Sequence, residues 1–288
     1  MVKPVADTCV SRREIAVNRL GCPREDVSDE RPLEYGVTQV LGSDLSWVHA
    51  GLGGEPTLLV HGFASTKNTW LPVLRRLSGQ AVDCFATDLP GSGDTPPDDR
   101  FSFDRSTELL SAFMHELGRG RRWTVVGHSM GGSIAMALSS MPRPAPTALV
   151  VESATPAPPH AAARLERIAS FAARGARPEI LGPVVSTWGV RLTKTDRRFL
   201  LREACRHSAD TLIQQSRSIL GGVPDFRVAA DVRTRFIFGQ HDQNRDVVAA
   251  QSSAERLGAR FVLFDGSGHT PHIEEPDRFV RVIVSDWS

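Results

Sequence analysis

The chain of 288 residues carries a formal net charge of +1, with 41% hydrophobic and 23% charged residues. A chain of this length and hydrophobicity can bury a large core, so we expect one globular domain of enzyme size. A near-neutral charge without a basic stripe argues against nucleic acid or an anionic membrane surface as a partner. The four cysteines have neither metal-ligand nor disulfide-framework spacing, and no apolar run approaches the ~20 residues of a membrane span. These features predict a soluble cytoplasmic protein.

In chain order, residues 1–32 are polar and charge-rich and are predicted to be an extension outside the core. Residues 35–51 then predict two antiparallel strands around a turn at Gly42-Ser43-Asp44. From there on, short apolar runs alternate with amphipathic ones, which is typical of a parallel sheet covered by helices on both faces. The strands are expected at 57–60, 82–89, 124–128, 148–153, 235–239 and 260–266. One helix is expected to end at Gly118, and the last to have Pro276 in its first turn.

Residues 155–222 interrupt this alternation. Their apolar residues recur at helical spacing, and no run within them is a convincing strand. We interpret this interval as an inserted helical cap. It divides the core into a first part, residues 33–154, and a second part, residues 223–288.

The stretch WTVVGHSMGG places Ser129 at the corner between a predicted strand and a predicted helix. Gly127 and Gly131 flank it in the pattern G-x-S-x-G, which in this context indicates a nucleophile elbow. A strained turn between a strand and a helix needs small neighbours, because side chains there would collide with the adjoining backbone. The alternative is a Gly/Ser loop that merely turns the chain.

A serine hydroxyl is a poor nucleophile unless a base removes its proton. His269 directly follows the last predicted strand, and the carboxyl ends of parallel strands are where α/β sheets assemble their sites. An acid that orients the histidine should also follow a strand and precede the histidine in sequence, as Asp242 does. The competing candidates are His272 for the base, and Glu152 and Asp246 for the acid.

Four motifs, in this order and spacing, resemble the α/β-hydrolase fold over about residues 33–288: LLVHGFAST, DLPGSGDT, VVGHSMGG, and the pair FGQHD and GSGHTPH. The resemblance implies a mostly parallel central sheet flanked by helices, with Ser129 as nucleophile, Asp242 as acid and His269 as base. It also implies that the backbone amides of Phe63 and Met130 form an oxyanion hole. By the same resemblance, His61, Asp88 and Asp94 are scaffold residues.

Serine at the elbow, rather than the aspartate of haloalkane dehalogenases and epoxide hydrolases, implies acyl chemistry. The resemblance therefore predicts hydrolysis of an ester, thioester or lactone of a small molecule through an acyl-enzyme, with no metal or organic cofactor. The Ser-Met-Gly-Gly run is also similar to that of C–C bond hydrolases that cleave diketones. A non-hydrolytic cyclase or a ligand receptor on the same fold is a further alternative.

The cap is expected to select the substrate, since it carries apolar residues outside the motifs. We predict a mainly apolar pocket, with Phe171, Val184 and Trp188 as substrate-binding residues. The alternative is that these side chains bury the cap's own small core. A homodimer is compatible with the sequence.

Overall fold

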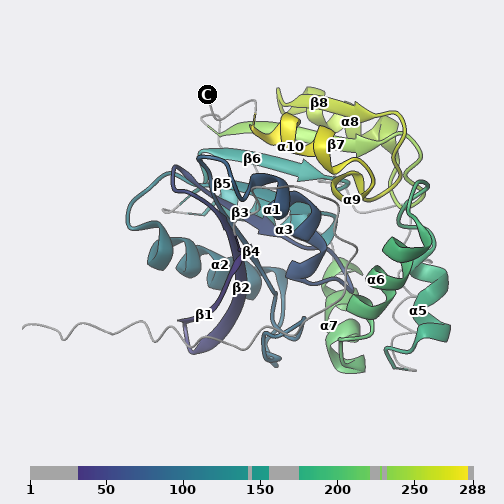
Figure 1. The fold of residues 1–288 in the computed structure, drawn as a ribbon, viewed down its shortest axis with the longest axis horizontal. Helices are drawn as coiled ribbons and strands as arrows, with labels where there is room; N and C mark the ends of the chain where they lie inside the picture. Colours follow the sequence, from purple (N-terminus) through teal and green to yellow (C-terminus); the bar gives the residue numbers. More distant parts are fainter. Residues whose placement is uncertain (1–31, 142–144, 156–174, 221–227, 229–231, 285–288) are drawn as a thin grey trace, which may run out of the picture.

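The structure is a computed structural model that describes residues 32–141, 145–155, 175–220, 228 and 232–284. Almost all of the predicted extension, together with the first part of the predicted cap and Phe171, lies outside these residues. The described part of the chain contains one eight-stranded sheet with helices around it (Figure 1).

The chain enters the sheet through a hairpin of β1 (Glu34–Val40) and β2 (Ser43–Gly51). The predicted turn is correct at Gly42 but not at Ser43 and Asp44, because the two turn residues are Leu41 and Gly42, whereas Ser43 already belongs to β2. Leu41 and Gly42 have φ angles of 48° and 77°. Two left-handed residues match the twist of the flanking strands, which is why two-residue hairpin turns favour them.

Six parallel strands form the rest of the sheet, and they confirm the predicted α/β class. They are β3 (Pro56–Val60), β4 (Asp83–Thr87), β5 (Thr124–His128), β6 (Ala148–Glu152), β7 (Arg233–Gly239) and β8 (Arg260–Phe264). The strand order is β1-β2-β4-β3-β5-β6-β7-β8, with β2 antiparallel to both of its neighbours. Because the strand order reverses at β3 and β5, their carboxyl ends border the crevice in which such sheets bind ligands.

Alternate residues of the buried strands pack on opposite faces of the sheet. In β5, Val125 belongs to a core cluster with α2 (Phe103–Gly118), α3 (Met130–Ser139) and α8 (Val247–Arg256). Val126 points to a second cluster with α1 (Leu71–Leu77) and α10 (Pro276–Val284). The period of two residues is that of a strand covered on both faces. Short helices complete these layers: η1 (Lys67–Trp70) before α1 and α9 (Pro271–Glu274) before α10.

Three helices of the predicted cap lie together beside the core (Figure 1): α5 (Pro178–Val185), α6 (Lys194–Ala204) and α7 (Ala209–Leu220). Residues 175–220 contain no strand, as the sequence predicts. The helices share an apolar cluster that includes Leu181, Trp188 and Leu200, together with Ala64 and Ile273 of the core. The cap is thus docked on the core by apolar packing next to the loop that follows β3.

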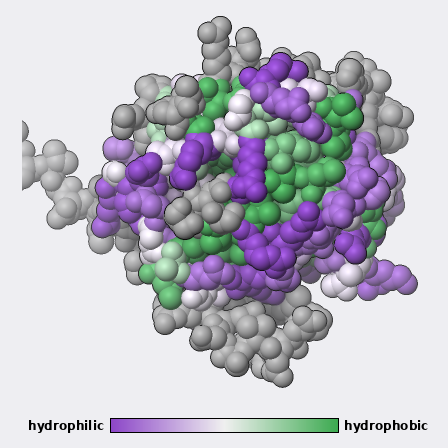
Figure 2. Space-filling model, turned by 90° about the horizontal axis from the view of Figure 1, so that it is seen from above, coloured by the Kyte–Doolittle hydropathy of each residue, from purple (hydrophilic) through white to green (hydrophobic). Residues whose placement is uncertain are grey.

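Strand β8 is an edge of the sheet, and its Phe261, Val262 and Leu263 are not fully buried. Figure 2 shows the molecule of Figure 1 from above. On the face seen in that view, a hydrophobic area lies in the middle with hydrophilic side chains around it. None of the helices among the described residues is both long and apolar enough to cross a membrane.

Candidate active site

Ser129 occupies a strained corner between β5 and α3. Its φ angle is 52° with ψ of −114°, and it is the residue that precedes the first helical residue, Met130. A non-glycine residue with positive φ is uncommon, and such strain concentrates at functional sites. The turn leaves Ser129 partly exposed although its neighbours His128 and Met130 are buried.

The glycines around Ser129 are required by space, as the sequence predicts. A Cβ atom on Gly127 would lie 2.2 Å from the carbonyl oxygen of Gly131. One on Gly131 would lie 2.3 Å from the carbonyl oxygen of Val60, and one on Gly132 would lie 2.7 Å from Ala154 Cβ. These distances are too short for real contacts, so glycine lets α3 approach the ends of β3 and β6.

The structure brings together the three side chains that the sequence analysis selects. Ser129 Oγ lies 3.0 Å from His269 Nε2, and His269 Nδ1 lies 2.8 Å from Asp242 Oδ2. The three residues come from three different strand ends, after β5, β7 and β8. With Nδ1–H donating to the carboxylate, Nε2 is left as the acceptor for the serine hydroxyl.

Asp242 is held as a carboxylate. Its side chain is fully buried, and Oδ1 accepts hydrogen bonds from the backbone N–H groups of Asn244 (2.7 Å) and Arg245 (3.1 Å). Burial by itself raises the pKa of Asp242, but the charge and hydrogen bond of His269, the N–H of Asn244 and the charge of Arg245 lower it below its ordinary value. A permanently charged carboxylate at this position favours the His269 tautomer described above.

The loop after β3 places a second backbone amide beside the serine. A Cβ atom on Gly62 would lie 3.2 Å from Ser129 Cβ, so the loop passes close to the elbow, and Phe63 follows directly. Neither the N–H of Phe63 nor that of Met130 donates a hydrogen bond to another described residue. Two such amides beside a partly exposed hydroxyl are the donors that an oxyanion needs.

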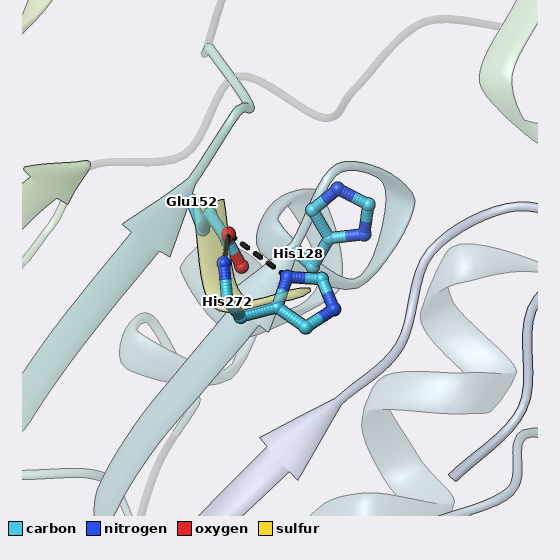
Figure 3. A group of neighbouring side chains, drawn as sticks. All are labelled: His128, Glu152 and His272. Atoms are coloured by element: carbon cyan, nitrogen blue, oxygen red, sulfur yellow. Dashed lines mark hydrogen bonds and ion pairs between the residues drawn. The ribbon is translucent and has the colours of Figure 1, made fainter. Parts of the chain in front are cut away.

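A buried cluster of His128, Glu152 and His272 (Figure 3) adjoins this site, with the ring centroids of His128 and His269 5.0 Å apart. The donor atoms lie within 4.8 Å of one another, but hydrogen bonds account for their arrangement. His272 Nδ1 donates to Glu152 Oε1 at 2.9 Å, and the backbone N–H of His272 donates to the same oxygen. His128 Nε2 donates to the carbonyl oxygen of His269 at 2.9 Å. Glu152 is therefore hydrogen-bonded to His272, whereas the carboxylate bonded to His269 is that of Asp242.

Burial dominates the titration of this cluster. It lowers the pKa values of His128 and His272 to about 3 and raises that of Glu152 to about 7. Both histidines are therefore neutral near pH 7. His272 also stacks on Trp70, with ring centroids 4.3 Å apart, which agrees with a packing role for this residue.

The other polar residues of the motifs contact the scaffold. His61 Nε2 accepts from the N–H of Leu89 at 3.0 Å and so ties the β3 loop to the β4 loop. Asp88 and Asp94 both bind the ammonium of buried Lys67, each at 2.6 Å. Asp246, the competing acid candidate, instead accepts from two backbone N–H groups at the start of α8, as a helix N-cap carboxylate does.

The predicted substrate-binding residues of the cap differ in their surroundings. Trp188 is buried in the cap cluster, and its carbonyl oxygen accepts from the hydroxyl of Thr270, next to His269. Val184 is only partly buried and packs against the same cluster, as does Phe63. Phe171 lies outside the described residues.

One residue that contacts the loop of the site, Gln215, lies outside all of the sequence motifs and was not predicted. Gln215 in α7 is fully buried, and its side chain accepts from the N–H of Ala64, directly after Phe63. This contact joins residues 151 positions apart, which no local pattern in the sequence indicates.

Comparisons with known proteins agree with this geometry. The sequence model described as "Alpha/beta hydrolase family" matches residues 57–282. The chain is 30% identical over 241 residues to the 2-succinyl-6-hydroxy-2,4-cyclohexadiene-1-carboxylate synthase of Enterobacter sp. (strain 638), covering 79% of this chain and 90% of that protein.

Solved structures show the same fold at low sequence identity. An esterase from Exiguobacterium antarcticum superimposes with a TM-score of 0.79 at 18% identity, over 88% of this chain and 98% of that one. The enol-lactonase from Burkholderia xenovorans LB400 superimposes with a TM-score of 0.73 at 19% identity, over 86% of this chain and 98% of that one. The extent of the sequence match, the strand order and the position of Ser129 lead to one conclusion: the chain belongs to the alpha/beta hydrolase family.

Proposed function

We propose that the chain is a serine hydrolase that cleaves an ester, thioester or lactone of a mainly apolar small molecule through an acyl-enzyme. The observation that carries the proposal is the continuous hydrogen-bond path from Ser129 Oγ through His269 to Asp242, beside two backbone amides that have no acceptor among the described residues. A nucleophile, a base and an oriented acid are the parts that acyl transfer requires.

In the proposed reaction, His269 Nε2 takes the proton of Ser129 as its oxygen attacks the carbonyl carbon. The amides of Phe63 and Met130 donate to the oxyanion of the tetrahedral intermediate. Collapse of the intermediate expels the alcohol, thiol or ring oxygen, which receives the proton from His269. A water molecule activated by His269 then attacks the acyl carbon, releases the acid and restores the Ser129 hydroxyl.

The test is a panel of p-nitrophenyl esters, thioesters and lactones of graded chain length, with Ser129→Ala as the blank. Intact-protein mass spectrometry under rapid acid quench should detect an acyl adduct on the unsubstituted protein and none on Ser129→Ala. Reaction with a fluorophosphonate probe, which phosphonylates serine and releases fluoride, checks that Ser129 is activated. Absence of both turnover and labelling contradicts the proposal.

The similarity to a protein named as a synthase supports a second candidate, a non-hydrolytic reaction in which the same residues transfer protons. It predicts a different experimental pattern: Ser129 reacts with the fluorophosphonate, but no ester, thioester or lactone leaves an acyl adduct. The mass measurement therefore separates the two functions.

A further inference from the structure

The loop that presents the Phe63 amide is held by the cap. Ala64 has a φ angle of 50°, a left-handed conformation that is unfavourable for a non-glycine residue. Its N–H donates to Gln215 Oε1 of α7 at 3.1 Å, and Gln215 is completely buried. An unfavourable backbone conformation beside a site persists only where its surroundings fix it.

The orientation of the Gln215 amide is itself fixed by a chain of hydrogen bonds. His207 Nδ1 lies 3.1 Å from the carbonyl oxygen of Ala204, which only accepts, so Nδ1 carries the proton. His207 is neutral, because burial lowers its pKa to about 4, so Nε2 is an acceptor. The hydroxyl of Ser92, 3.1 Å from Nε2, therefore donates to His207.

Since the Ser92 hydrogen points to His207, Ser92 Oγ can only accept from Gln215. The partner at 3.1 Å must then be the amide nitrogen Nε2, which directs the other end of the amide, Oε1, at the N–H of Ala64. Each hydrogen bond in this series thus determines which atom is the donor in the next one.

We propose that Gln215 is a positioning residue that sets the Phe63 amide for the oxyanion; this rests on the function proposed above. The cap binds the same loop at a second point, where Glu203 of α6 accepts from the hydroxyl of Thr66 at 2.7 Å. Both contacts cross from the cap to the core. Docking of α6 and α7 therefore completes the oxyanion site.

Two substitutions of Gln215 test the direction of the bond. Gln215→Met keeps the length of the side chain but has no strong acceptor for the Ala64 N–H. Gln215→Glu, in its protonated form, restores both bonds, since its carbonyl oxygen accepts from Ala64 and its O–H donates to Ser92. Ser216→Ala is the matched control, because Ser216 is the next residue of α7, is equally buried and has no hydrogen-bond partner among the described residues.

The first measurement is the rate of fluorophosphonate labelling of Ser129, together with kcat and KM for an ester that the unsubstituted protein hydrolyses. A displaced oxyanion donor should slow labelling and kcat in Gln215→Met by roughly 10- to 100-fold with KM little changed. Gln215→Glu should recover part of the rate, and Ser216→Ala should match the unsubstituted protein. Unchanged labelling and kcat in Gln215→Met would overturn the proposal, as would an equal loss in Ser216→Ala.

The second measurement, amide hydrogen exchange at Ala64, does not depend on activity. We expect faster exchange at Ala64 in Gln215→Met than in Ser216→Ala, with the melting temperatures of both variants recorded alongside. If the unsubstituted protein neither labels nor turns over, the proposed function is wrong, and exchange alone decides the role of Gln215. Unaltered exchange in Gln215→Met then contradicts the positioning of this loop, whereas accelerated exchange supports it.

Discussion

At the scale of single residues, Ser129 combines a strained backbone with a reactive side chain. Its left-handed φ belongs to the turn and not to the hydroxyl, so Ser129→Ala keeps the corner while removing one oxygen. We expect turnover to fall to the background rate. Folding stability should stay within about 1 kcal/mol of the unsubstituted protein, since Ser129 is a partly exposed residue. Urea denaturation followed by circular dichroism checks the second part, and a large loss of stability would contradict it.

The acid can be assigned by comparing two isosteric substitutions. Asp242→Asn keeps the shape of the residue bonded to His269 but favours the wrong tautomer, which in serine-protease triads lowers kcat by ~10⁴-fold. Glu152→Gln alters the carboxylate bonded to His272 and should leave most of the activity. Steady-state kinetics on one ester decide between them. Near-normal rates in Asp242→Asn with a collapse in Glu152→Gln would move the acid to Glu152.

The sequence predicted the positions of Ser129, Asp242 and His269 because each follows a strand whose apolar, β-branched pattern is local. The choice between Asp242 and Glu152 could not be settled there, since Asp242 follows a strand, Glu152 ends one, and both precede the histidine. Only the three-dimensional arrangement separates them, by pairing Glu152 with His272. Gln215 escaped prediction for a related reason: its role depends on partners at residues 64 and 92, far away in sequence.

At the scale of elements, a buried lysine joins the loops after β3 and β4. Lys67 is 1% exposed and binds Asp88, whose side chain is fully buried, and Asp94. Removing one partner of a buried ion pair leaves the other charge without compensation and costs about 3–5 kcal/mol. Lys67→Met should therefore lower the free energy of unfolding by about that amount, as measured by urea denaturation.

An exposed ion pair provides the control. Arg76 of α1 binds Asp277 of α10, but both side chains are well exposed to solvent. Water and salt screen such pairs, so Arg76→Gln should cost less than about 1 kcal/mol. Similar losses for Lys67→Met and Arg76→Gln would show that the buried pair contributes no more than a surface pair.

The cap helices give a prediction on substrate choice. Val184 is partly buried on α5 and packs against the cluster that Phe63 also contacts. If this side chain borders the substrate, Val184→Phe should shift the preferred acyl chain to shorter esters, changing rate ratios across the panel by roughly tenfold. Labelling of Ser129 should persist. Val190→Ala, at an exposed position of the cap, is the control, and unchanged ratios in Val184→Phe would assign Val184 to the cap's own packing.

The sequence predicted the strands well and the helices less completely. Both-face burial gives β3 to β6 mainly apolar runs, which are visible without a structure. The sequence predicted the end of one helix at Gly118, where α2 does end, but it indicated no start; α2 begins at Phe103, where Ser102 caps it. Its first turn carries polar side chains, so periodicity alone could not place its start.

At the scale of the whole molecule, buried ionisable groups join the two halves of the core. His128 ends β5, Glu152 ends β6, and His272 lies in α9, so the cluster connects residues on either side of the cap in sequence. Its hydrogen bonds hold the backbone of His269 through His128. Any change in its charge should therefore affect the stability of the fold.

The two histidines and the glutamate impose opposite pH dependences on the free energy of unfolding. The pKa values of His128 and His272 are about 3 when folded against 6.5 when unfolded, so the stability they contribute is lost as the pH falls below about 6.5. The pKa of Glu152 is about 7 when folded against 4.5 when unfolded. Its contribution is complete below about pH 4.5 and is lost as the pH rises through about 7.

Glu152→Gln isolates the glutamate part of this balance. The amide resembles the protonated acid. The pH dependence that the two histidines impose on the free energy of unfolding should therefore be similar in the variant and in the unsubstituted protein. From about pH 5 to pH 8 the unfolded chain has lost the proton of this glutamate, whereas the folded protein must either retain it or ionise Glu152 in the core. Both lower the free energy of unfolding, and the variant, which has no proton to lose here, avoids both. The variant should gain stability relative to the unsubstituted protein over this range, by up to about 3 kcal/mol for the shift from 4.5 to about 7. Urea denaturation of both proteins at several pH values measures the difference. A stability difference that stays constant from pH 5 to pH 8 would mean that Glu152 is ionised throughout, with its charge compensated by His272.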